Sequence, residues 1–212
     1  MNKILVIGAN GKIGRILCTK IAERGLACKA MLRDIHNTDF SPEVERVEAD
    51  LEGDISHAMK DCDCVIFSAG SGAQTGFDKT LLIDLWGAKK AIDCAKDNNI
   101  KHFIMVSSRG ADNPDNGPQR IKPYLVAKYF ADDYLQKQQG SKLNYTILRP
   151  GRLTDSKACG LVRTDRPASQ ELQQISRADT ADAIIHCLNN HKVHNKVFEL
   201  FEGDRPISEA LG

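Results

Sequence analysis

The sequence predicts an α/β fold in which one parallel sheet is covered by helices on both faces. Short β-branched or apolar runs alternate with longer stretches of helical periodicity along the chain. Two of the short runs, Ile4–Ile7 and Val65–Phe67, are apolar on both sides, as is typical of strands that are covered on both faces. The alternation of strand and helix favours parallel pairing with right-handed crossovers, which gives a doubly wound sheet.

The individual elements follow from these patterns. The runs expected to form strands are Lys3–Ile7, Cys28–Leu32, Arg46–Ala49, Cys64–Phe67, His102–Val106, Tyr145–Leu148 and Val197–Phe201. Helical periodicity marks Gly11–Arg24, Thr80–Asn98, Pro123–Gln139 and Asp179–Asn189. The less regular segments follow the carboxyl ends of strands, where the ligand crevice of such a sheet forms; they are Gly70–Gly76, Arg109–Lys122 and Gly151–Gln174.

Length and charge narrow the class of protein. The chain has 212 residues, with 29 Lys and Arg against 28 Asp and Glu, and this length predicts one domain over residues 1–212. The near-neutral balance argues against a nucleic-acid or anionic-membrane partner. No apolar run reaches the roughly 20 residues of a membrane span, and the amino-terminal run resembles no secretory signal. We expect a soluble, cytoplasmic protein.

Metal binding is not expected. The seven cysteines contain no C-x-x-C pair, and the six histidines show no spacing typical of metal ligands. We therefore interpret the cysteines as reduced side chains, most of them in apolar stretches.

A glycine-rich turn, Gly8-Ala9-Asn10-Gly11-Lys12-Ile13-Gly14, joins the first strand to the first helix. In this context Gly8 can turn the chain tightly, Gly11 lets the backbone approach a pyrophosphate, and Gly14 lets the helix pack on the strand. The helix start then presents free N–H groups to the phosphates. The spacing is G-x-x-G-x-x-G, and a plain tight turn is the alternative. We predict a Rossmann-like, dinucleotide-binding fold, with Gly8, Asn10, Gly11, Lys12, Ile13 and Gly14 at the cofactor.

The end of the second strand should select the cofactor. It reads Met31-Leu32-Arg33-Asp34, and Arg33 at the strand end would pair with a 2′-phosphate through its planar guanidinium. Lys12 could add a second positive charge. Asp34 could instead hold the ribose hydroxyl of NAD, and Arg33 could be a solvated surface charge. We expect NADP (NADPH) to be preferred over NAD.

Tyr124 and Lys128 are four residues apart, so they lie on one face of the predicted helix. A nearby ammonium stabilises phenolate and lowers the pKa of a tyrosine, so that the tyrosine can act as a general acid or base near neutral pH. The spacing alone is common by chance. The Tyr–Lys pair is more significant here because it follows Ser107-Ser108 along the chain. A serine hydroxyl at that position could polarise the carbonyl that the tyrosine protonates.

Together these motifs resemble the short-chain dehydrogenase/reductase superfamily, and most closely its small atypical, NmrA-like members. The resemblance also rests on Asp50-Leu51, Ser68-Ala69-Gly70 and Arg149-Pro150-Gly151, and it covers nearly the whole chain.

The resemblance assigns roles by position. It implies that Asp50 and Leu51 lie by the adenine, and that Ser68, Ala69 and Gly70 line the adenosine ribose and the pyrophosphate. It makes Ser108 the catalytic serine, with Ser107 as the competitor, and Tyr124 the proton donor. It further implies that Lys128 holds the nicotinamide ribose, and that Pro150 and Gly151 pass near the nicotinamide.

Two features depart from the family. Asp84 stands where many relatives carry an asparagine, so a proton relay through that side chain is not implied. The segment 151–178 is short, which leaves little protein to hold a sugar nucleotide.

We therefore expect an NADPH-dependent oxidoreductase that transfers hydride to a small carbonyl, quinone or flavin-like acceptor. The alternatives are a non-catalytic NADP(H) sensor and, with less support, an epimerase or isomerase. The long helices Thr80–Asn98 and Pro123–Gln139 are where members of the resembled family often pair, so the resemblance allows a homodimer and leaves the oligomeric state open.

Overall fold

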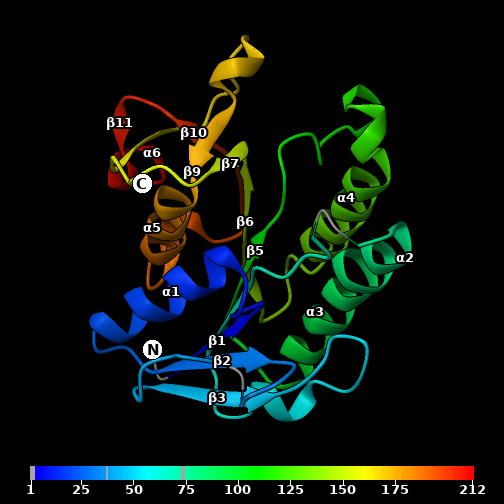
Figure 1. Cartoon of the computed structure of the whole chain (residues 1–212), viewed down its shortest axis with the longest axis vertical. Helices are drawn as coiled ribbons and strands as arrows, with labels where there is room; N and C mark the ends of the chain where they lie inside the picture. The colour runs from blue at the N-terminus through cyan, green and yellow to red at the C-terminus, as the bar shows by residue number, and fades with distance from the viewer. Residues whose placement is uncertain (1–2, 37, 73–74) are drawn as a thin grey trace.

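The computed structural model describes residues 3–36, 38–72 and 75–212 and has a central sheet between two helical layers (Figure 1). Met1 and Asn2 of the amino-terminal run, and residues 73 and 74 of the predicted crevice segment, lie outside this description. Within the described ranges, no helix combines the length and the apolar character needed to cross a membrane.

All seven predicted strands are present and pair in parallel. They are β1 (Ile4–Ile7), β2 (Cys28–Leu32), β3 (Val44–Glu48), β4 (Cys64–Phe67), β5 (His102–Val106), β6 (Asn144–Pro150) and β10 (Lys196–Glu202). In the part of the chain that is described, the strand order is β11-β8-β10-β6-β5-β4-β1-β2-β3. The chain order reverses between β1 and β4, where a doubly wound sheet forms its ligand crevice.

The predicted doubly wound parallel sheet is confirmed, and one edge carries antiparallel strands that the sequence did not predict. There β8 (Leu161–Arg163) and β11 (Arg205–Pro206) pair antiparallel with each other, and β8 also pairs antiparallel with β10. A further parallel pair, β7 (Arg152–Thr154) with β9 (Gln174–Ser176), lies outside the main sheet. These strands have two or three residues each, too few for a period-two pattern to stand out.

The four predicted helices are present. The helical segments are α1 (Lys12–Glu23), η1 (Ser56–Met59), α2 (Phe77–Lys79), η2 (Thr80–Gly87), α3 (Ala88–Asp97), η3 (Pro114–Asn116), η4 (Gln119–Ile121), α4 (Lys122–Gln136), η5 (Gln170–Leu172), α5 (Arg177–Cys187), η6 (His191–Val193) and α6 (Ile207–Ala210). The predicted helix Thr80–Asn98 is continuous but changes type, because η2 is a π-helix and α3 is an α-helix.

Alternate residues of the central strands supply two separate cores. Ile4 and Val6 of β1 face a core shared with α1 and α5, whereas Leu5 and Ile7 face a core shared with α3 and α4. Figure 1 shows these helices on opposite sides of the sheet, with α1 and α5 on one side and α3 and α4 on the other. The period of two along each strand therefore explains why these runs are apolar on both sides.

Candidate functional site

The glycine-rich turn presses closely against the end of β4. Gly8 has a φ of +83°, and a Cβ atom built on it would lie 2.6 Å from the backbone N of Ala69. A Cβ atom on Gly14 would lie 2.2 Å from the carbonyl oxygen of Gly8. Both distances are too short for a real side chain, so the first and third glycines are required by the turn itself. Gly11 has more room, because its Cβ would lie 3.2 Å from the Gly8 oxygen.

The start of α1 is free to bind an anion. Gly11 precedes the helix and provides no side-chain cap, and the first turn has no acidic residue. The unpaired N–H groups and the helix dipole therefore favour phosphate at this point. The carboxamide oxygen of Asn10 accepts a hydrogen bond from Arg15.

A cavity of about 490 Å³ opens beside this turn. Nine of the predicted cofactor residues line it: Gly8, Asn10, Gly11, Arg33, Asp50, Leu51, Ser68, Ala69 and Gly70. Its size and its glycine cradle fit the adenosine and pyrophosphate part of a dinucleotide. Ser71 and Thr75 of the predicted crevice segment 70–76 also line it, whereas sequence reasoning missed Lys79 and Ile83 in the same wall. These two lie in α2 and η2, which no motif connected with the glycine turn.

The remaining predicted cofactor residues lie outside this wall. The ammonium of Lys12 lies 2.8 Å from Asp155, whose other oxygen binds Arg177. Ile13 and Gly14 are buried where α1 packs on the sheet, and Pro150 is buried at the end of β6. Their cofactor roles stay predictions.

The two candidates for selecting the cofactor both border the cavity. Arg33 and Asp34 follow β2, and both side chains are exposed. Asp34 accepts a hydrogen bond from the backbone N–H of His36, so one of its carboxylate oxygens is engaged with its own loop.

The predicted catalytic residues come together at the carboxyl end of β5. Tyr124 lies in the first turn of α4, near Ser108, and Lys128 lies one turn further. Burial raises the pKa of the Tyr124 phenol, and the opposing effects of the Lys128 charge and of the Ser108 hydrogen bond are smaller. The prediction of a lowered pKa is therefore corrected. Tyr124 is a neutral phenol near pH 7, which is the form that can donate a proton.

Lys128 is held from within the protein. Its Nζ lies 3.1 Å from Oδ1 of Asp84, and it contacts the carbonyl oxygens of Ala69 and Val106 at 3.5 and 3.4 Å. Burial works against its charge, but the negative charge of Asp84 outweighs that effect and raises the pKa of the ammonium. Asp84 is turned inward from the π-helix η2, a helix type that is frequent at functional sites.

A second buried pair lies one helical turn beyond Lys128. Oδ2 of Asp132 accepts a hydrogen bond from Nε of Arg149 at 2.9 Å. Ser107 is buried, whereas Ser108 is partly exposed and neighbours Tyr124. Of the two candidate serines, Ser108 is therefore the one beside the phenol.

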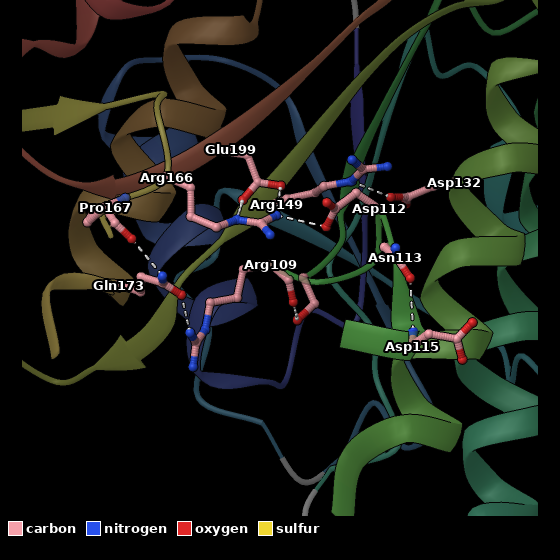
Figure 2. A network of polar contacts seen from close by, with 11 residues as sticks. Arg109, Asp112, Asn113, Asp115, Asp132, Arg149, Arg166, Pro167, Gln173 and Glu199 are labelled. Atoms are coloured by element: carbon pink, nitrogen blue, oxygen red, sulfur yellow. Dashed lines mark hydrogen bonds and ion pairs between the residues drawn. The ribbon is translucent and has the colours of Figure 1, made fainter. Parts of the chain in front are cut away.

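A polar network joins the loop after β5 to the segment between β8 and β9 and to β10 (Figure 2). Arg166 binds Glu199 with two nitrogens and Asp112 with one. Arg109 donates to the side-chain oxygen of Gln173. Most of its members belong to two of the predicted crevice segments, 109–122 and 151–174. Sequence reasoning missed it, because its members are far apart along the chain.

A parallel sheet with a glycine cradle at its switch point, and with a tyrosine and a lysine beside it, defines an atypical short-chain dehydrogenase/reductase. Comparison with known proteins agrees. A family described as NAD(P)H-binding matches residues 8–191, and the chain belongs to this NAD(P)-binding oxidoreductase family.

Three relatives illustrate the range of the family. The chain is 43% identical over 217 residues to a Bacillus subtilis (strain 168) protein called uncharacterized sugar epimerase YhfK, covering 99% of this chain and 98% of that one. A Bacillus halodurans structure, described as a candidate NAD-dependent epimerase/dehydratase, is 42% identical, with a TM-score of 0.92 over 100% of this chain and 99% of that one. ChuY, an anaerobillin reductase from Escherichia coli O157:H7, is 26% identical, with a TM-score of 0.78 over 96% and 98%.

Proposed function

We propose that this protein is an NADPH-dependent reductase of a small carbonyl, quinone or flavin-like acceptor. The observation that carries the proposal is the meeting of Ser108, neutral Tyr124 and Lys128 at the end of β5, next to a cavity that fits the nucleotide. The family binds NAD(P)(H), and the reductase name of one relative agrees with this reaction class.

The cofactor, when bound, supplies the hydride. The remaining work is done by residues of this chain. The Tyr124 phenol would donate the proton that a reduced carbonyl oxygen requires, and the Ser108 hydroxyl would donate a hydrogen bond to the same oxygen as its charge develops. Once the proton has left Tyr124, the positive charge of Lys128 would stabilise the phenolate. Asp84 holds that charge in place.

We further propose that Arg33 selects the phosphorylated cofactor. Its guanidinium is exposed at the cavity, and within the described residues it has no ion-pair partner within 4.0 Å. A planar guanidinium pairs well with a phosphate and gains little from a hydroxyl. We expect Arg33→Gln to weaken NADPH binding by roughly ten- to hundredfold and to leave NADH binding unchanged. Arg24→Gln, at the far end of α1, is the matched control.

The reductase proposal is tested by NADPH oxidation with a panel of aldehydes, ketones, quinones and flavins. We expect Tyr124→Phe to lower kcat for carbonyls by about 10²- to 10⁴-fold, the range of general acid catalysis. Quinones and flavins should be affected less, because water can protonate their products. Tight NADPH binding without turnover of any acceptor would contradict the proposal and favour the sensor alternative.

A second candidate is an epimerase, because a relative at 43% identity carries that name. Interconversion of nucleotide sugars without net cofactor consumption would favour it. Against it stands the short segment 151–178, which leaves little protein to bind a sugar nucleotide.

A further inference from the structure

Arginines gather beside the candidate catalytic residues. Arg109 follows β5, Arg149 lies in β6, Arg152 begins β7, and Arg166 follows β8. Two of them are neutralised by carboxylates: Arg149 by Asp132, and Arg166 by Asp112 and Glu199. These two therefore have a structural explanation.

The other two arginines meet only side-chain amides. Arg109 donates to Gln173, and Arg152 donates to Gln174. Within residues 3–36, 38–72 and 75–212, no carboxylate lies within 4.0 Å of either guanidinium. In Figure 2 the contrast is visible, because Arg109 reaches toward Gln173 whereas Arg166 reaches toward two carboxylates.

Arg109 is the more unusual of the two, because it is partly buried without a counter-ion. Burial and the neighbouring charges of Arg166 and Arg152 lower the pKa of its guanidinium. Partly burying a charge is costly unless the charge is paired. Gln173 is itself held in place, since its Nε2 donates to the carbonyl oxygen of Pro167 at 2.7 Å. The guanidinium is thus presented by a fixed amide and still lacks an anion.

The position of Arg109 links it to the acceptor side of the site. It directly follows Ser108, and its backbone N–H donates to the carbonyl oxygen of Pro150 at 3.0 Å. Gln173 lies against the next residue, because a Cβ atom on Gly151 would come within 2.6 Å of the Gln173 carbonyl oxygen. Arg109 and Gln173 therefore both contact the strand end, Pro150-Gly151, that the resemblance puts near the nicotinamide.

We propose that Arg109 binds an oxyanion of the acceptor, a carboxylate or a phosphate, and so selects anionic acceptors. This inference rests on the proposed reductase function and adds the substrate class. A guanidinium pairs with either oxyanion through two parallel hydrogen bonds, and it replaces the counter-ion that the fold does not supply.

Two pairs of probes separate the possible sources of the anion. FMN and riboflavin differ in a phosphate, and 4-formylbenzoate and its methyl ester differ in a carboxylate charge. Each probe is titrated by calorimetry against the complex of the protein with NADP⁺, and each is also tested as an acceptor in NADPH oxidation. The variants are Arg109→Met, which removes the charge, and Arg109→Lys, which keeps the charge but cannot form the two parallel hydrogen bonds of a guanidinium. Arg24→Met is the control: it removes a positive charge at the carboxyl end of α1, and so shows whether a change in net charge alone alters binding.

We expect Arg109→Met to weaken binding of at least one anionic probe by roughly ten- to hundredfold and to leave its neutral partner unchanged. A loss confined to FMN assigns a phosphate, and a loss confined to 4-formylbenzoate assigns a carboxylate. Arg109→Lys should lose less affinity for the same anionic probe, because it keeps the positive charge. Urea unfolding of Arg109→Met, expected to match wild type, excludes a folding defect.

The inference is overturned if wild type binds neither anionic probe, or if Arg109→Met weakens both members of each pair equally. It is also overturned if Arg24→Met reproduces the loss. Failure of the reductase proposal would give a different result. No probe would then oxidise NADPH, but calorimetry would still show tighter binding of the anionic probe than of its neutral partner.

Discussion

Replacing Asp84 by asparagine should destabilise the protein through the charge pair behind the candidate site. Asp84 is fully buried, Lys128 is 2% exposed, and their charged atoms lie 3.1 Å apart. The asparagine has nearly the same volume and can still accept the hydrogen bond that the Ser71 backbone N–H donates to the carboxylate. The substitution therefore removes the negative charge and little else.

The lost charge leaves the Lys128 ammonium with two long contacts, to the carbonyl oxygens of Ala69 and Val106. Removing one partner of a buried ion pair costs about 3–5 kcal/mol. The ammonium can escape by losing its proton, and at pH 7 this limits the cost to about 5 kcal/mol. We expect a loss of about 3–5 kcal/mol in the free energy of unfolding. For a chain of this size that loss corresponds to a melting temperature lower by roughly 6–20 °C.

Urea unfolding at pH 7, followed by circular dichroism, measures this loss. The double variant Asp84→Asn/Lys128→Met removes both charges and should recover most of the stability, because a buried pair can often be replaced by neutral groups without loss. A loss below about 1 kcal/mol for Asp84→Asn, or a double variant that is no more stable than the single one, would refute the reasoning.

Three further predictions concern other parts of the molecule. Gly14→Ala forces the glycine turn to shift and should weaken NADPH binding by about tenfold or more in a fluorescence titration, whereas Gly53→Ala, whose Cβ has ordinary contacts, should not. Burial lowers the pKa of His102 to about 3, whereas an unfolded histidine titrates near 6.5. The unfolded chain therefore gains a proton as pH falls below 6.5, and the native state loses about 1.4 kcal/mol per pH unit from this group, a slope that His102→Gln should remove in urea unfolding at pH 5 and 7. Finally, Trp86 and Phe130 are 52% and 50% exposed on the packed segments η2 and α4, and we propose a homodimer through this face. Trp86→Glu with Phe130→Glu should then sediment as a monomer, and a monomeric wild type would contradict the proposal.

The central sheet could be predicted from sequence because its strands are buried on both faces. Residues such as Leu5 and Val6 face different cores, and no competing pattern fits such short apolar runs between helices. The glycine turn could be predicted for a similar reason. Its conformation demands glycine at Gly8 and Gly14, so geometry and sequence are tied together locally.

The acceptor side could not be predicted in the same way. The contact between Arg109 and Gln173 joins residues 64 positions apart, and neither residue type specifies a partner. Asp84 is buried within a π-helix, a helix type that sequence patterns do not distinguish from an α-helix. The raised pKa of Tyr124 depends on burial, which the Tyr–Lys spacing alone does not reveal.

The antiparallel edge of the sheet has a consequence for the order in which the protein can form during synthesis. Strand β8 lies in the acceptor-side segment, and both of its partners, β10 and β11, are made after it. A nascent chain that has reached Pro150 already contains β1 to β6 and the glycine turn, but it lacks everything that holds β8. Because chains are made and begin to fold from the amino terminus, the residues of the glycine turn are synthesised well before the strands that hold β8, and before α5 completes the core beneath α1. The antiparallel edge of the sheet is therefore complete only after synthesis has passed residue 206.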